Sequence, residues 1–189
     1  MPAKPFTQEE IHQIRETVPV HDKKRLLIEI GLSTLLRVAD LRMLRWKDVL
    51  SKDGSVHEML TVRLYPTLEP KTVLVLEAAK LSLLARAARK SDEVRRNSYL
   101  FNYWRKPDQA MTTQGCIKLI KSACLKAGVN PKDRSCHSLR KTIPTIIYEN
   151  ERDLPSIQSL LWARSESVVR RYLSIERTSA FDQMKRFSL

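Results

Sequence analysis

The segment His137-Ser138-Leu139-Arg140 opens a helical pattern that runs to about Asn150, and Tyr172 follows it further along the chain. A histidine and an arginine three residues apart share one face of a helix. From there they can hold two oxygens of one phosphate, and a tyrosine brought to the same place can attack its phosphorus. An attack of this kind is the chemistry of cutting DNA through a covalent phosphotyrosine.

The charge of the chain agrees with a nucleic-acid partner. Its 189 residues include 34 Lys+Arg against 21 Asp+Glu, for a formal net charge of +13. Such an excess favours a polyanion. No apolar run approaches the ~20 residues of a membrane span, and no signal pattern opens the chain. We expect double-stranded DNA as the partner, no membrane association, and a cytoplasmic protein that is nucleoid-associated when bound to DNA.

Cysteine and histidine spacing predicts no metal site. Cys116, Cys124 and Cys136 are odd in number and lack CxxC spacing, which is typical of reduced thiols. The four histidines are scattered, without the spacing of metal ligands. We therefore expect no cofactor.

The hydrophobic pattern predicts a mainly helical chain. Thr7 to Glu10 reads as a capping box that opens a first helix, which Pro19 ends. A second helical pattern runs from Asp22 towards Leu36, and a short third one continues through Leu44. Later helices are expected over residues 77–89, 112–127, 137–150 (with a proline inside), 155–161 and 165–173.

One small sheet is expected among these helices. Met59 to Leu64 alternates as a strand, Thr72 to Leu76 reads as a second, and the proline-containing Tyr65 to Pro70 separates them. The two strands predict an antiparallel ribbon. The fold class is therefore mainly α with a small antiparallel β-sheet (α+β).

Four segments carry a resemblance to a known family. Leu36 to Val49 reads Leu-Arg-Val-Ala-Asp-Leu-Arg-Met-Leu-Arg-Trp-Lys-Asp-Val and is very similar to the first catalytic box of the tyrosine recombinase (phage integrase) family. Three later segments resemble the following segments of that family in order. They are Tyr99 to Phe101 with the helix Gln114 to Ala127, then His137 to Thr142, and finally Asp153 to Leu161 continuing to Tyr172. The resemblance spans about Thr7 to Leu173.

The resemblance implies a role for each matching residue. Arg37 and Arg140 match the two arginines that clamp the scissile phosphate, and His137 matches the residue that assists proton transfer. Tyr172 matches the nucleophile, and Asp40 a supporting acidic residue that orients Arg37. Planar guanidinium groups suit the charge on the equatorial oxygens of a phosphorane. Other interpretations stay open: Arg37 as a surface arginine, His137 as a helix-start residue, and Tyr172 as a core tyrosine.

The chain departs from the family pattern at two helper positions. The family places a catalytic lysine in the turn of the ribbon, where it protonates the leaving 5′ oxygen, and the aligned residue here is Pro66 or Leu68. Lys71 takes that role if the hairpin is shortened. Trp162-Ala163 stands where the family has Gly-His, so Ala163 replaces a phosphate-binding group. Trp162 either supplies an indole N–H or packs.

The resemblance also implies how the chain is organised. We expect a single catalytic domain of the tyrosine recombinase type over residues 1–189, without an N-terminal core-binding domain, and with residues 174–189 as a short tail. Phe181, Met184 and Phe187 give that tail an apolar face. Relatives dock such tails on a neighbouring protomer, so we expect a homo-oligomer on DNA, with packing onto its own domain as the alternative. Candidate DNA contacts are Arg42, Lys47, Lys118, Lys121 and Lys141.

The function expected from these observations is site-specific DNA recombination or integration through Tyr172. Because two helper positions depart from the pattern, the alternative is a catalytically degenerate DNA-binding regulator or accessory protein. A type IB topoisomerase-like activity is a third candidate, since it shares the first half-reaction.

Overall fold

In the computed structural model, which describes residues 3–64, 69–89, 97–103 and 106–175, the first helix begins at the predicted capping box. Thr7 Oγ1 accepts the backbone N–H of Glu10 at 3.1 Å, and the Glu10 carboxylate accepts the N–H of Thr7 at 2.9 Å. These two bonds satisfy two donors that a helix start leaves open. Helix α1 spans Gln8–Thr17.

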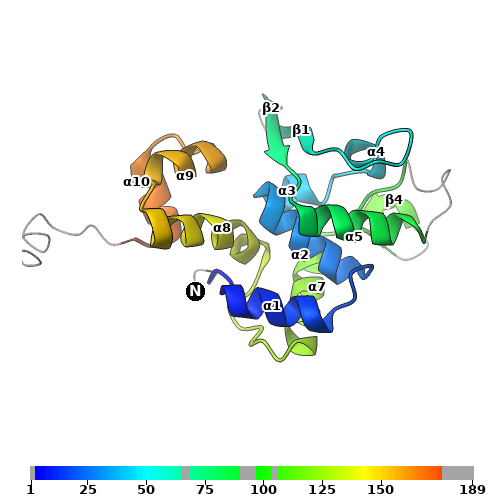
Figure 1. The fold of residues 1–189 in the computed structure, drawn as a ribbon, viewed down its shortest axis with the longest axis horizontal. Coiled ribbons are helices and arrows are strands. Elements are labelled where there is room, and N and C mark those ends of the chain that lie inside the picture. The colour runs from blue at the N-terminus through cyan, green and yellow to red at the C-terminus, as the bar shows by residue number, and fades with distance from the viewer. Residues whose placement is uncertain (1–2, 65–68, 90–96, 104–105, 176–189) are drawn as a thin grey trace, which may run out of the picture. The chain divides into compact units, whose positions relative to one another are not determined.

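Helix α2, Lys23–Thr34, forms the centre of the core in the first part of the chain. Leu26, Leu27 and Ile30 on this helix are fully buried, and its buried residues lie on all sides. A helix that is buried all round needs neighbours on every face. Helices α5, Glu77–Ala87, and α7, Thr113–Lys126, supply two of them, as Figure 1 shows, and α1 packs against α7.

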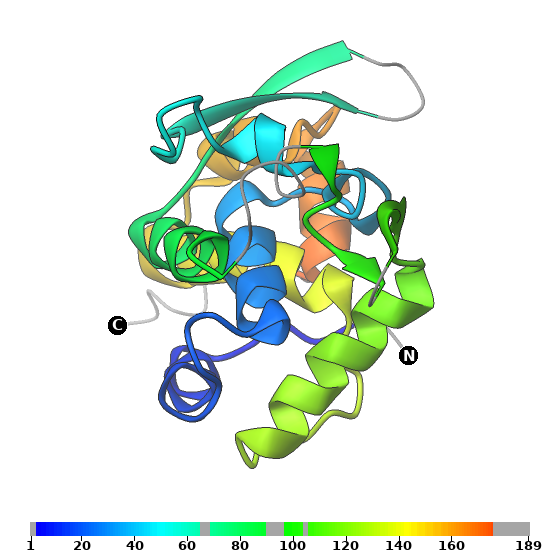
Figure 2. The same ribbon diagram turned by 90° about the vertical axis from the view of Figure 1, so that its right-hand side faces the viewer.

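The predicted ribbon is present, with a different second strand. Strand β1, Met59–Leu64, pairs antiparallel with β2, Glu69–Leu74, so the expected start of β2 at Thr72 and its end at Leu76 were wrong. Pro70 lies opposite Arg63 in a two-stranded ribbon, where every position is on an edge and proline is tolerated. Figures 1 and 2 show the ribbon at the opposite end of this part of the molecule from α1.

A second ribbon corrects the expectation of one sheet. Strand β3, Asn102–Tyr103, pairs antiparallel with β4, Lys106–Ala110. A strand of two residues is too short to show alternation, and Pro107 and Asp108 belong to residue types that are depleted in strands. The fold class itself, mainly α with small antiparallel sheets, is confirmed.

The chain divides into two compact units, residues 1–143 and 144–189. Helix α8, Cys136–Glu151, contains this boundary and Pro144. Because proline has no N–H, residue 144 cannot donate the usual helical bond to the carbonyl of Arg140. In the second unit α9, Leu154–Leu161, packs against α10, Glu166–Leu173. A single-domain organisation of residues 1–189 stays a prediction.

The three cysteines are buried and free. Burial raises the pKa of Cys116 and of Cys124 to about 11 and that of Cys136 to about 12, so these thiols stay protonated near neutral pH. Within the described ranges no helix combines the length and the apolar character needed to cross a bilayer. The described ranges also contain no group of three or more His, Cys, Asp or Glu side chains that could hold a metal ion.

Candidate active site

Arg37 stands at the start of the short helix α3, Val38–Leu41. Leu35, which follows α2, has a left-handed backbone (φ 53°) that ends α2 and redirects the chain. The carbonyl of Arg37 then accepts the N–H groups of Asp40 and Leu41 at 3.0 and 2.8 Å. These bonds fix the backbone at Arg37 and leave its side chain exposed, while Asp40 is buried.

The first turn of α8 is fixed by bonds from the loop before it. Asp133 has a left-handed backbone (φ 60°), and its carbonyl accepts the hydroxyl of Ser138 at 3.3 Å. The Ser138 hydroxyl also accepts the N–H of Ser135 at 3.0 Å, and the N–H of His137 donates to Ser135 Oγ at 3.2 Å. The turn that carries His137 and Arg140 is therefore held by short-range contacts.

Arg37 lies close enough to this turn to act on His137. Partial desolvation lowers the pKa of His137, and the positive charges of Arg140, Lys141 and Arg37 lower it further. The structure therefore brings three of the predicted catalytic residues, Arg37, His137 and Arg140, near one another within the first unit, although Arg37 comes from a distant part of the sequence.

Lys141 belongs to this cluster more than to the surface. Only 8% of the residue is exposed, and burial lowers the pKa of its ammonium group. Lys47 on helix α4, Trp46–Val49, and Lys118 and Lys121 on α7 are exposed by contrast. Arg42 is half-buried, and its Nη1 donates to the carbonyl of Met111 at 3.4 Å.

The second unit carries Tyr172 and Trp162. Tyr172 lies half-buried in the last turn of α10, next to Arg170 and Arg171. Trp162 ends α9 with a left-handed backbone (φ 51°), and its N–H donates to the carbonyl of Ser159 at 3.2 Å. A role of Trp162 in packing, or alternatively in binding phosphate, stays a prediction.

Lys71 lies on β2, opposite Val62 of β1. Its Nζ is 3.5 Å from a carboxylate oxygen of Glu69, and a third of its side chain is exposed. Pro66 and Leu68, which align with the expected lysine, lie outside the described residues. The role of Lys71 as proton donor therefore stays a prediction.

Two residues near the cluster have no counterpart among the sequence predictions. Gly31 of α2 lies against Leu139 of α8, because a Cβ built there would be 2.7 Å from Leu139 Cδ1. Arg134, just before α8, bonds to the N-terminal segment. Both contacts join residues far apart in sequence, and no local pattern marks such contacts.

The match to a family model decides the classification. The model of the phage integrase family matches residues 4–178. The chain belongs to the phage integrase family. The resemblance seen in the four boxes is thereby confirmed.

Curated relatives carry integrase and recombinase names. The chain is 25% identical over 169 residues to the "Probable integrase/recombinase YoeC" of Bacillus subtilis, covering 89% of this chain and 87% of that protein. It is 30% identical over 161 residues to the tyrosine recombinase XerD of Rickettsia bellii, covering 79% of this chain and 51% of XerD. The phage integrase chain thus spans about half the length of this XerD relative.

Solved structures agree on the fold. The crystal structure of XerA recombinase matches with a TM-score of 0.70 at 19% identity, covering 100% of this chain and 65% of that one. XerH site-specific recombinase bound to difH substrate, in a pre-cleavage complex, matches with a TM-score of 0.70 at 20% identity over 98% of this chain and 54% of that one. The recombinase-like fold is therefore confirmed.

Proposed function

We propose that this phage integrase family chain is a site-specific DNA recombinase or integrase that cleaves and rejoins strands through a covalent 3′-phosphotyrosine at Tyr172. The observation that carries the proposal is that His137 and Arg140 share the start of α8, while Arg37, at the start of α3, lies near enough for its charge to lower the pKa of His137. Two arginines can stabilise the charge that develops on the non-bridging oxygens during an in-line attack on a phosphodiester, and a histidine beside them can accept a proton.

Each of these groups has a defined part in the proposed reaction. The Tyr172 Oη forms a bond to phosphorus while the bond from phosphorus to the 5′ oxygen breaks. The phenol proton passes to His137, whose lowered pKa keeps the imidazole neutral and able to accept it. Arg37 and Arg140 hold the non-bridging oxygens, and Lys71 gives a proton to the 5′ oxygen. Rejoining reverses these steps without ATP or metal, because the phosphotyrosine retains the bond energy.

Double-stranded DNA is the proposed partner. Exposed Lys47, Lys118 and Lys121, together with Arg42, supply cations on the elements α4 and α7 and beside α3. Lysine contacts to phosphate release counterions, so the affinity for DNA is expected to fall steeply as salt rises. A net charge of +13 favours association with nucleic acid, and the chain is accordingly proposed to be nucleoid-associated when bound to DNA.

Assembly on DNA through the tail is a further part of the proposal. Phe181, Met184 and Phe187 lie outside the described residues, and the proposal rests on their spacing in the sequence. A chain ending at residue 175 should bind a single site as tightly as the full chain but form smaller complexes on DNA. Sedimentation of both chains on one duplex measures this difference.

A DNA-binding regulator without cleavage is the second candidate. The ion pair between Lys71 and Glu69 favours it, because the Lys71 ammonium group already has a carboxylate partner 3.5 Å away. The alanine at position 163, in place of a phosphate-binding group, favours it as well.

Trapping of a covalent adduct separates the two candidates. Supercoiled and nicked DNA would be incubated with wild type, Tyr172→Phe and Arg140→Ala, and quenched with SDS. A protein–DNA adduct in wild type that both variants lack supports the recombinase. Tyr148→Phe, a half-buried tyrosine of the second unit, is the matched control and should retain the adduct. Salt-sensitive DNA binding without an adduct on any substrate would favour the regulator.

A further inference from the structure

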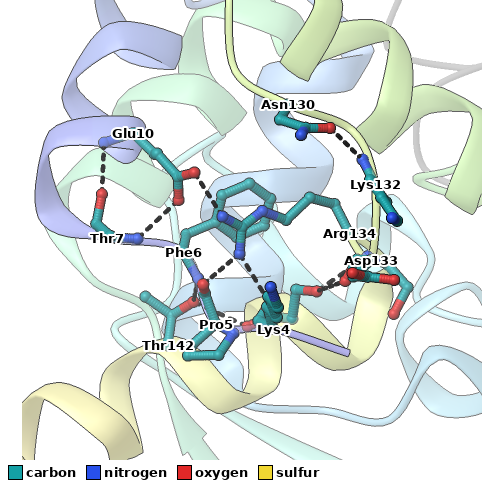
Figure 3. A network of polar contacts seen from close by, with 12 residues as sticks. Lys4, Pro5, Phe6, Thr7, Glu10, Asn130, Lys132, Asp133, Arg134 and Thr142 are labelled. Carbon is teal, nitrogen blue, oxygen red and sulfur yellow. Dashed lines mark hydrogen bonds and ion pairs between the residues drawn. The ribbon is translucent and has the colours of Figure 1, made fainter. Parts of the chain in front are cut away.

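Arg134 joins the N-terminal segment to the loop before α8. Its Nη1 donates to the carbonyl of Lys4 at 3.1 Å and also to that of Pro5, and its Nη2 lies 2.5 Å from a Glu10 carboxylate oxygen. The guanidinium carbon lies 4.8 Å from the centre of the Phe6 ring, as a cation–π contact requires. Figure 3 shows the guanidinium enclosed by these groups.

The same N-terminal segment forms hydrogen bonds before and after the turn that carries His137 and Arg140. Before the turn, the N–H of Lys4 donates to the carbonyl of Asp133 at 3.1 Å. After the turn, the N–H of Phe6 donates to Thr142 Oγ1 at 3.0 Å, and both groups are buried. Residues 4–10, called the N-terminal clasp below, therefore bridge the loop and the second turn of α8 (Figure 3).

The bonds of the clasp are connected to those that fix His137. Thr142 Oγ1 donates to the carbonyl of Ser138 at 2.8 Å, and the Ser138 hydroxyl donates to the carbonyl of Asp133. That carbonyl is the one that Lys4 also bonds. A displacement of the clasp would thus change both ends of the turn at once.

We infer that Arg134 is a positioning residue, which through the N-terminal clasp holds His137 and Arg140 in register with Arg37. Its guanidinium is suited to this task because it serves two backbone carbonyls and one carboxylate together. A lysine keeps the charge but cannot reproduce that planar set of donors. The consequence for catalysis rests on the proposed function, whereas the consequence for the geometry of His137 does not.

Arg25 offers a closely matched control. Like the side chain of Arg134, that of Arg25 is 10% exposed. Its guanidinium also donates to one carboxylate, that of Glu29, and to two backbone carbonyls, those of Arg15 and Val18. It lies on α2 and forms no part of the clasp. Arg134→Lys and Arg25→Lys therefore remove comparable bonds, and only the first removes bonds of the N-terminal clasp.

The experiment is an NMR titration of His137 in the free protein, with its signal assigned by loss in His137→Gln. Partial burial lowers the pKa of His137, and the charges that lower it further are those of Arg140 and Lys141 on α8 and of Arg37 before α3. If the clasp holds His137 in this partly buried place beside Arg37, Arg134→Lys raises its pKa towards the ordinary value. Arg25→Lys should leave that pKa unchanged at a similar loss of Tm. Adduct formation on DNA should fall by up to about 10²-fold in Arg134→Lys, because a small misplacement of a catalytic group can slow a reaction by that factor. The affinity for DNA should be retained.

The outcomes are separable. An unchanged His137 pKa in Arg134→Lys, or equal changes in both lysine variants, overturns the positioning role. If wild type forms no adduct, the proposed function fails, while the titration still decides the role of Arg134. If Arg134→Lys does not fold, Glu10→Gln is used instead, because it weakens the ion pair with Arg134 and leaves Arg134 in place. A raised pKa of His137 in Glu10→Gln then supports the positioning role of Arg134, and an unchanged pKa overturns it.

Discussion

Gly31 of α2 lies against Leu139 of α8 with no space for a side chain, since a Cβ at position 31 would be 2.7 Å from Leu139 Cδ1 and 3.2 Å from its Cβ. Leu139 stands between Ser138 and Arg140 in the turn of the candidate site, and it is fully buried. The central helix of the core therefore sets how closely the turn with His137 and Arg140 can approach it.

Gly31→Ala should destabilise the protein even though alanine is the better helix former. The gain in helix propensity is about 1 kcal/mol, and overpacking against Leu139 costs about 1–3 kcal/mol. Urea unfolding measures the difference. The double variant Gly31→Ala/Leu139→Ala should lose less than the sum of the two single losses, because the second change makes room for the first. A more stable Gly31→Ala would contradict the close contact.

The buried carboxylate of Glu29 should contribute more to stability than Arg15, one of the two arginines beside it. Glu29 is 2% exposed and lies 2.9 Å from Arg15 Nη2 and 2.6 Å from Arg25 Nε. Glu29→Gln leaves two guanidinium groups without their anion, and breaking a buried pair costs about 3–5 kcal/mol. Arg15→Ala should cost about 0–1 kcal/mol, because the Arg15 side chain is 41% exposed. Equal losses in urea unfolding for the two variants would refute this ranking.

Local patterns predicted most of the elements, and non-local contacts explain the rest. The capping box at Thr7 and the helix start at Leu154, beside Pro155, depend on neighbouring residues and could be read directly. The start of β2 could not, because its pairing with β1 overrides the low strand preference of Pro70. In the site, the family resemblance indicated Arg37, whereas Arg134 depends on a contact with the other end of the sequence.

Stability should depend on pH through His137. Its pKa is lower in the folded protein than the ordinary value near 6.5, so the unfolded chain binds the proton more readily. The free energy of unfolding that this residue contributes is therefore fully present above about pH 6.5 and is lost as pH falls through the folded pKa. His137→Gln should remove this part of the pH dependence. Thermal unfolding of both proteins between pH 5 and 8 tests it, and parallel curves would contradict it.

The proton donor can be tested by changing the leaving group. If Lys71 protonates the 5′ oxygen, Lys71→Ala should slow adduct formation by about 10²–10⁴-fold, the usual contribution of a general acid. A substrate with sulfur in place of that 5′ oxygen leaves as a thiolate and needs no proton. Lys71→Ala should therefore cleave the sulfur substrate as fast as wild type does. Glu69→Gln, which removes the partner of Lys71, should not slow cleavage of the oxygen substrate.

Three results of this experiment have distinct meanings. Rescue of Lys71→Ala by sulfur alone identifies Lys71 as the proton donor, despite its place on β2 outside the turn. A wild type that cleaves only the sulfur substrate would show that Tyr172, His137 and the arginines form a working site that lacks an acid, as the departure from the family pattern at the ribbon turn suggests. Failure of wild type on both substrates, with DNA still bound, would favour the regulator over the recombinase.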